Sequence, residues 1–244
     1  MKPFLILQLR PEREASDDEY AAILAKGGLA ASDTHRIEVD RDPLPDALNI
    51  HDYGAIIVGG GPGCISDAPD DKSPSEARAE AAIMSLMPQI IAEDHPFLGC
   101  CYGMGALGAA LGGEVGKQRY AESVGTADCT ITPDGADDAL LAGLPDHFKA
   151  FVGHKEAVQA LPPRATHLIS APTCPMQMIR AGRHVYATQF HPEADGDVFA
   201  ARIRLYKDKG YFDPAQADDL IAACRAVTVD VPKEILKRFV ARYG

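Results

Sequence analysis

Two adjacent thiols with flanking glycines, in the run Gly99-Cys100-Cys101-Tyr102-Gly103, carry the clearest chemistry in the chain. Apolar residues precede this run and an Ala-, Leu- and Gly-rich segment follows it, so a strand is expected to turn directly into a helix. Glycines two residues before and two after a nucleophile are typical of an elbow that lifts the nucleophile above a sheet. Because side chains at these two positions would collide across the turn, the spacing selects Cys101 and leaves Cys100 as the last residue of the buried strand.

A thiol in this position would lie at the N-terminus of a helix. The positive end of the helix dipole and the unpaired N–H groups of the first turn are expected to stabilise a thiolate at Cys101. The alternative is a buried pair of cysteines followed by a Gly-rich helix that packs tightly on the sheet. The motif alone leaves both interpretations open, and the catalytic one requires a base.

His191-Pro192-Glu193, directly after the apolar run 185–190, offers that base. Pro192 favours extended backbone at His191, and side chains two residues apart in an extended chain point to the same side. Glu193 is therefore expected to orient one ring nitrogen of His191 while the other faces Cys101, as in a nucleophile–base–carboxylate triad. The alternative is a strand-end turn with exposed polar residues. Two motifs that each end an apolar strand favour the triad, which requires the sulfur and the imidazole to meet at one edge of the fold.

A glycine-rich turn, 59–63, follows another apolar run at 55–58. The backbone N–H groups of Gly60 and Gly61, together with that of Tyr102, are candidates for stabilising an oxyanion. A dinucleotide site is the competing interpretation of such a turn. It is disfavoured because the turn lacks the G-x-G-x-x-G spacing and no helix pattern follows it at once.

The elements that position these motifs follow from the hydrophobic pattern. Short apolar runs bounded by turn residues predict buried strands, over 4–9, 35–39, 55–58 and 96–100. Apolar residues at three- and four-residue spacing predict helices, over 17–26, 76–93 and 104–111. This alternation predicts an α/β fold in which a parallel sheet carries helices on both faces.

The second half of the chain has denser strand signals, over 124–132, 148–152, 166–170, 176–179 and 185–190. Gly182 predicts a hairpin-like turn between the last two strands. From Asp195 the pattern becomes helical, and an amphipathic terminal helix is expected over 233–243. No internal repeat or long linker divides the sequence, so residues 1–244 are expected to form a single domain.

The 244 residues include 24 Lys and Arg against 35 Asp and Glu, which gives a formal net charge of −11. This acidic balance argues against nucleic acid and against an anionic membrane surface as partners. The first apolar run is too short to span a membrane, and no cleavable-signal pattern follows it. The six Cys and eight His show no C-x-x-C or H-x-x-x-H spacing, so no metal, cofactor or disulfide framework is expected. Reduced thiols in a cytoplasm are the plain interpretation.

Together these motifs resemble the class I glutamine amidotransferase family. The resemblance rests on Gly59-Gly60-Gly61-Pro62, on Gly99-Cys100-Cys101-Tyr102-Gly103 and on Gln189-Phe190-His191-Pro192-Glu193, in the family's order and at similar separations. It covers about residues 1–200 and is greatest for the amidotransferase portion of GMP synthase. It implies a flavodoxin-like, doubly wound, mostly parallel sheet with helices on both faces, followed by a helical tail over about 201–244.

The resemblance also implies a reaction. Such proteins hydrolyse the side-chain amide of glutamine through a γ-glutamyl thioester and release ammonia. Cys101 would attack the amide carbon, and His191 would protonate the departing ammonia and then activate water, while Glu193 holds the imidazole. Gln189 and His154 would lie near the substrate; a loop histidine without function is an equal alternative for His154.

One position departs from the family pattern. Relatives usually carry Gln four residues after the nucleophile, where it helps to hold substrate glutamine, and this chain has Gly105 there. The substrate is therefore either glutamine or another γ-glutamyl compound, or the chain is a binding relative without catalysis. Since no phosphate loop or second nucleotide-binding domain is recognised, the protein either passes ammonia to a separate synthase subunit or acts alone as a γ-glutamyl hydrolase. A redox role for the vicinal thiols is disfavoured because it would leave His191 and Glu193 idle.

Overall fold

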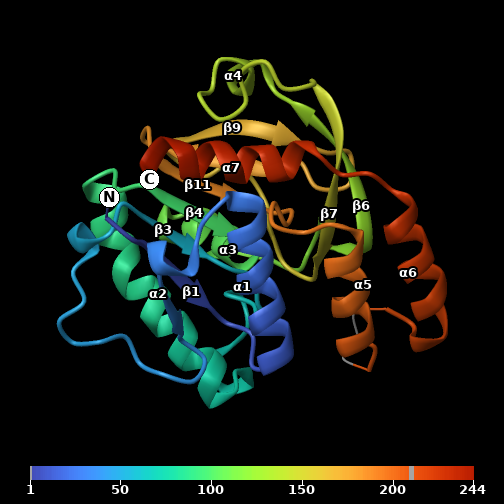
Figure 1. Cartoon of the computed structure of the whole chain (residues 1–244), viewed down its shortest axis with the longest axis horizontal. Helices are drawn as coiled ribbons and strands as arrows, with labels where there is room; N and C mark the ends of the chain where they lie inside the picture. Colours follow the sequence, from blue (N-terminus) through green and yellow to red (C-terminus); the bar gives the residue numbers. More distant parts are fainter. Residues whose placement is uncertain (1, 209–211) are drawn as a thin grey trace.

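The computed structural model describes residues 2–208 and 212–244. The described residues form a nine-stranded central sheet in the order β2-β1-β3-β4-β11-β10-β9-β6-β7 (Figure 1). Parallel pairing joins the first five of these strands, which are β2 (Thr34–Glu38), β1 (Phe4–Gln8), β3 (Ala55–Val58), β4 (Phe97–Cys100) and β11 (Val185–Thr188). This half of the sheet confirms the parallel α/β arrangement predicted from the sequence.

The other four strands continue the sheet with antiparallel pairing. They are β10 (Met178–Ala181), β9 (Ala165–Ser170), β6 (Glu122–Ile131) and β7 (His147–His154). Gly182 has a φ of +57° between β10 and β11, which confirms the hairpin predicted there. A separate short pair joins β5 (Val115–Gly116) to β8 (Ala157–Val158).

Helices cover both faces of the parallel half. One face carries α1 (Arg13–Gly27) and α7 (Val231–Tyr243), and the other carries α2 (Pro74–Ala92) and α3 (Tyr102–Ala110). Successive residues of β1 point to opposite faces, so that Phe4 packs on the α1 side and Leu5 on the α2 side. Burial on both faces accounts for the apolar runs that predicted β1, β3 and β4. The expectation of a fully buried strand over 35–39 is wrong for β2, because β2 lies at the edge of the sheet and only Ile37 within it is buried.

The C-terminal segment has two different packing sites (Figure 1). α5 (Gly196–Leu205) and α6 (Ala217–Ala226) pack against each other and against β6 and β7. α7 instead returns to the parallel half and places Ile235, Leu236 and Phe239 in the same core as α1. The helical extension expected after about residue 200 is therefore observed, and its last helix belongs to the sheet core.

The ends of several elements differ from the sequence prediction. α1 begins at Arg13, before the predicted start at residue 17, since its first turn is polar and has no apolar spacing from which a helix could be predicted. A single turn, α4 (Pro133–Ala136), follows β6. β11 ends at Thr188, so Gln189 and Phe190 lie beyond the strand and lead to His191. Among residues 2–208 and 212–244, no helix is long and apolar enough to cross a membrane.

Candidate active site

Cys101 occupies the sharp turn between β4 and α3. Its φ of +54° and ψ of −89° form a conformation that residues other than glycine rarely adopt. A Cβ added at Gly99 would lie 2.7 Å from the backbone of Gly103, so only glycine fits there. The Cys101 N–H donates to Thr188 O at 2.7 Å, which connects the turn to the end of β11. Cys100 is buried in the strand before the turn, as the glycine spacing predicted.

Gly103 does not have the steric requirement for glycine that the sequence predicted. A Cβ added there would meet Val58 at 3.6 Å, which is an ordinary van der Waals distance. The steric demand for glycine therefore falls on Gly99, whose neighbour across the turn is the backbone of Gly103. The expectation that side chains would collide at both positions is wrong for Gly103.

His191 lies beyond the end of β11, where its N–H donates to Phe151 O of β7 at 3.0 Å. Its Nδ1 is 2.9 Å from Glu193 Oε1, and both side chains are buried. Arg202 of α5 donates from Nη2 to the same carboxylate oxygen at 2.7 Å. The contact predicted from the two-residue spacing is thus present, together with an arginine that the sequence did not reveal.

The Cys101 sulfur and the His191 ring line a common hollow beside α5. We call it the His191 hollow; its wall includes Arg10, Cys101, Val124, His191, Phe199 and Ile203. Cys101 is partly exposed, whereas the other five cysteines are buried. Gln189 Nε2 lies 3.9 Å from the sulfur and donates a weak hydrogen bond to it. The nucleophile and base expected from the sequence therefore lie at one edge of the fold.

The electrostatics of the site favour the neutral forms of the Cys101 thiol and the His191 imidazole. Burial raises the pKa of Cys101 to about 12, although Arg10 partly opposes this. Burial also lowers the pKa of His191, and the carboxylate of Glu193 offsets this only in part. The expectation that the helix N-terminus holds a thiolate is wrong for this resting site, because desolvation outweighs a helix-dipole effect of about 0.3–1 kcal/mol. The resting pair is a thiol and a neutral imidazole.

Glu193 is the charged member of the group. Burial opposes its ionisation, but His191 and Arg202 hold the pKa of its carboxyl well below the usual range. Its Oε1 contacts both partners, while its Oε2 has no hydrogen-bond partner among the described residues. Nδ1 of His191 also lies 3.1 Å from Arg202 Nη1. The ionised Glu193 can only accept, so its shorter contact favours the tautomer with the proton on Nδ1, in which Nε2 is unprotonated.

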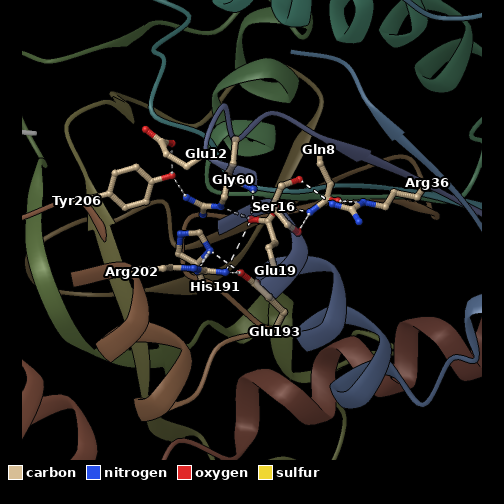
Figure 2. Close-up of polar contacts among 11 residues, drawn as sticks. Gln8, Glu12, Ser16, Glu19, Arg36, Gly60, His191, Glu193, Arg202 and Tyr206 are labelled. Atoms are coloured by element: carbon tan, nitrogen blue, oxygen red, sulfur yellow. Dashed lines mark hydrogen bonds and ion pairs between the residues drawn. The ribbon is translucent and has the colours of Figure 1, made fainter. Parts of the chain in front are cut away.

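A buried polar network supports these residues (Figure 2). Glu19 of α1 accepts from Arg10 Nε at 2.8 Å and from the Gly60 N–H at 3.1 Å. Arg10 also donates to the Tyr206 hydroxyl at 3.3 Å, and Arg202 Nη2 lies 3.8 Å from Glu19 Oε1. The sequence gives no signal for this network, because charged side chains on separate elements share no spacing pattern.

The glycine-rich turn makes room for this network. A Cβ at Gly59 would collide with the Glu19 carboxylate, and a Cβ at Gly60 would lie 2.7 Å from His191 Cε1. Because the Gly60 N–H already donates to Glu19, it differs from the oxyanion donor predicted there. Gly61 lines the His191 hollow, and its N–H has no hydrogen-bond partner within the described part of the chain. Gly61 therefore remains the donor candidate in this turn.

A second hollow adjoins the first at the sulfur. We call it the Glu156 hollow; its wall includes Gly61, Cys101, Tyr102, Lys155, Glu156 and Gln189. Tyr102 is the first residue of α3, so its N–H lacks an intrahelical partner and is a second donor beside Gly61. Since Cys101 and Gly61 belong to both walls, the sulfur stands at the junction of the two hollows.

His154 is buried, and both of its ring nitrogens have protein partners. Nδ1 lies 2.8 Å from Glu156 O, and Nε2 lies 2.8 Å from Glu122 Oε2. These contacts fix the segment that carries Glu156. His154 therefore helps to position Glu156, and because it also lies in the wall of the hollow that contains Glu156, its expected place near the substrate stays a prediction.

One buried cluster in residues 2–208 and 212–244 brings potential metal-ligand atoms as close together as they would lie around a metal ion. Donor atoms of Glu122, His154 and Cys174 lie within 4.8 Å of one another. The Glu122 carboxylate already accepts hydrogen bonds from Thr173 and from Gln177 Nε2, in addition to its contact with His154. We interpret the cluster as a hydrogen-bonded support for His154.

Glu156 occupies the space beside Gly105. A Cβ at Gly105 would lie 2.8 Å from Glu156 Oε1. The backbone N–H groups of Ile65 and Ser66 hold the Glu156 carboxylate there, at 3.0 and 2.6 Å. Another segment thus supplies a polar side chain next to the position where the resemblance leads one to expect Gln. The sequence around Gly105 carries no signal of this replacement.

Comparison with known proteins agrees with this architecture. Residues 23–204 match the family described as Glutamine amidotransferase class-I. A GMP synthase [glutamine-hydrolyzing] of Ectopseudomonas mendocina (strain ymp) is 31% identical over 191 residues, covering 72% of this chain and 33% of the relative. The corresponding protein of Herminiimonas arsenicoxydans is 34% identical over 152 residues, covering 59% and 26%. The chain therefore spans only 26–33% of the length of these two relatives.

Solved structures share the whole fold. A glutamine amidotransferase from Thermotoga maritima has a TM-score of 0.75 at 19% identity, covering 100% of this chain and 98% of that one. A glutamine amido transferase from Methylobacillus flagellatus has a TM-score of 0.73 at 21% identity, covering 100% and 96%. At these identities the likeness shows the fold alone. The family match over residues 23–204 shows that this chain is a member of the class I glutamine amidotransferase family.

Proposed function

We propose that this protein releases glutamate from a γ-glutamyl amide through a thioester on Cys101. The observation that carries the proposal is the hollow shared by Cys101 and His191, with Glu193 bound to Nδ1 of the ring. Membership of the family supports a cysteine-dependent amidohydrolase or amidotransferase. Glutamine is the first candidate substrate, because the relatives described above are named glutamine-hydrolyzing.

The first half-reaction forms the thioester. His191 Nε2 takes the thiol proton as the Cys101 sulfur attacks the amide carbon. The N–H groups of Gly61 and Tyr102 stabilise the oxyanion. The C–N bond then breaks, His191 gives its proton to the departing nitrogen, and ammonia or an amine leaves.

The second half-reaction hydrolyses the thioester. Water attacks the thioester carbon while His191 removes a proton from it. The C–S bond breaks, the proton passes from His191 to the Cys101 sulfur, and glutamate leaves. Each half-reaction begins with a neutral imidazole, and the lowered pKa of His191 supports this order of events.

The pH dependence follows from the same electrostatics. Because burial lowers the pKa of His191 below 6.5, kcat/KM is expected to fall only as the pH drops through that lowered value. Because burial raises the pKa of Cys101 to about 12, its ionisation gives no descending limb near neutral pH. Glutamate release measured from about pH 5 to about pH 9 checks this. A profile that descends between about pH 8 and pH 9 would indicate a resting thiolate–imidazolium pair and contradict the expectation.

The Glu156 hollow carries the charges that a γ-glutamyl group requires. The α-ammonium of this group needs an anionic partner, and its α-carboxylate needs a cationic one. Glu156 and Lys155 lie in the same wall and supply both signs. Because Ile65 and Ser66 already hold the Glu156 carboxylate, little of its conformational freedom remains to be lost on binding.

Glu156→Gln is expected to raise KM for the substrate about tenfold or more, with a smaller change in kcat. The physical reason is the loss of a charge-assisted hydrogen bond to the α-ammonium, worth about 1.5–3 kcal/mol. Steady-state kinetics measure the effect, and thermal melting shows whether the variant is folded. Glu234→Gln, on α7 and outside both hollows, is the matched control. An unchanged KM in a folded Glu156→Gln protein would remove Glu156 from substrate recognition.

A second candidate is a stand-alone γ-glutamyl hydrolase that acts on a compound other than glutamine. Gly105 favours it, because the side chain that usually holds glutamine is replaced. A binding relative without catalysis is the third candidate, and transfer of ammonia to a separate synthase subunit is a further step that the first candidate allows.

One experiment separates these candidates. Purified protein is incubated with glutamine and with a panel of γ-glutamyl amides, and glutamate and ammonia are measured. Glutamate from glutamine supports the first candidate, and glutamate from the other amides alone supports the second. Ligand binding that is unaffected by Cys101→Ser, with no glutamate from any amide, would contradict catalysis and support the third.

A further inference from the structure

The position of the His191 hollow determines which half of a substrate it receives. Cys101 lies in the walls of both hollows, but His191 lies only in the wall of this one. In the proposed function, on which this inference rests, His191 protonates the departing nitrogen. The amine half of the substrate therefore enters the His191 hollow, and the γ-glutamyl half remains in the Glu156 hollow.

Apolar side chains form much of the wall of the His191 hollow. Val124 of β6 and Phe199 and Ile203 of α5 contribute carbon surface to it. The Phe199 ring lies edge-on to the His191 ring, with 5.6 Å between their centroids, so the apolar wall is next to the proton donor. Ammonia has no carbon with which to cover such a wall. An amine half with an apolar side chain does, and its burial is worth about 25 cal/mol per Å².

Arg10 places a guanidinium, ion-paired with Glu19, in the wall of the same hollow. Its side chain is buried, with Nε donating to Glu19 at 2.8 Å and Nη1 donating to Tyr206 at 3.3 Å. No hydrogen bond from Arg10 Nη2 is formed within the described residues, and a Cβ at Gly60 would lie 2.9 Å from this nitrogen. A guanidinium with an unused donor in the wall of a hollow is suited to bind a carboxylate.

We propose that the substrate is a γ-glutamyl dipeptide whose second residue has an apolar side chain. In such a molecule the carbon next to the departing nitrogen bears both a carboxylate and the side chain. Arg10 binds this carboxylate, while Val124, Phe199 and Ile203 cover the side chain. One water is consumed as the γ-amide C–N bond breaks, and the products are glutamate and a free apolar amino acid whose nitrogen receives the proton from His191.

Three substrates test this assignment on the purified full chain: γ-glutamyl-leucine, glutamine, and γ-glutamyl-isopentylamide, which keeps the leucine carbon chain but lacks its carboxylate. The kcat/KM for γ-glutamyl-leucine is expected to exceed that for glutamine by at least about tenfold, with the isopentylamide in between. Glutamine cleaved as well as γ-glutamyl-leucine would overturn this inference and leave the thioester proposal standing. An isopentylamide cleaved as well as γ-glutamyl-leucine would overturn the role of Arg10. Release of glutamate from none of the three would overturn the proposed function itself.

Val124→Phe tests the location of the amine half. The added ring fills the hollow, so the ratio of kcat/KM for γ-glutamyl-leucine to that for glutamine is expected to fall about tenfold. Val227→Phe is the matched control. Val227, like Val124, is a partly buried valine that packs against the hydrophobic cluster of α5 and α6, but it lies outside the His191 hollow. An unchanged ratio in a Val124→Phe protein that melts at the temperature of the control would overturn the assignment of this hollow.

Discussion

Replacement of Cys101 by alanine is expected to reduce glutamate release by about 10⁴-fold or more. Without the sulfur no thioester forms, and the remaining groups supply only orientation and oxyanion donors. The side chain is small and partly exposed, so the variant is expected to fold. Steady-state glutamate release, with the best γ-glutamyl substrate of the unaltered protein, measures the loss.

Cys100→Ala is the matched control for this change. The Cys100 side chain is buried in the core that α1 and α7 cover, so its removal is expected to lower the free energy of unfolding by about 1 kcal/mol. Glutamate release should change little. Equal losses of activity in the two variants would contradict the choice of nucleophile, and an active Cys101→Ala protein would contradict the thioester.

His191→Gln is expected to lower kcat by about 10³–10⁴-fold. The pKa of Cys101 is about 12, so without a base the thiol stays protonated near neutral pH and attacks slowly. Glutamine retains an N–H that can donate to Glu193, and the ion pair of Glu193 with Arg202 remains, so the buried charges stay compensated. Single-turnover and steady-state glutamate release measure the effect on the chemical step.

His35→Gln is the control for the histidine change. His35 is exposed on the edge strand β2, where its ring contacts the Tyr53 hydroxyl. Its replacement should leave kcat close to that of the unaltered protein. A His191→Gln protein with nearly full kcat would show that the thiol ionises without the imidazole, and the proposed mechanism would be wrong.

The positions of the candidate catalytic residues were predictable because their signals are local in the sequence. Two glycines around Cys101 predict the turn, and Pro192 with the two-residue spacing predicts the contact of His191 with Glu193. That the two motifs meet follows from β4 and β11 being adjacent parallel strands, since both motifs follow the carboxyl ends of these strands. The alternation of elements predicts such a sheet but not which strands are neighbours.

The charged side chains that support this site were not predictable, because their contacts join segments that are distant in the sequence. Arg10, Glu19 and Arg202 come from the end of β1, from α1 and from α5, and only the folded chain brings them together. The role of Gly60 was predicted wrongly for the same reason, because its N–H partner and the groups that exclude a side chain there belong to distant segments.

The protonation state of the Cys101 thiol could not be predicted from the sequence either. A helix N-terminus can be predicted from the pattern after Cys101, and its dipole favours a thiolate. The loss of water around the sulfur cannot be predicted from that pattern, and this desolvation raises the pKa of the thiol to about 12. The two effects have opposite signs, and the larger one is a property of the tertiary fold.

The most direct measurement is to label the unaltered protein with a glutamine analogue that has an electrophilic carbon in place of its amide, and to locate the label by mass spectrometry. The expected result is a single label on Cys101, formed much more slowly in His191→Gln and prevented by excess γ-glutamyl substrate. A label on Cys100 or Cys64, or labelling of Cys101 at the same rate with and without the His191 imidazole, would contradict the claim that this sulfur and this imidazole act together.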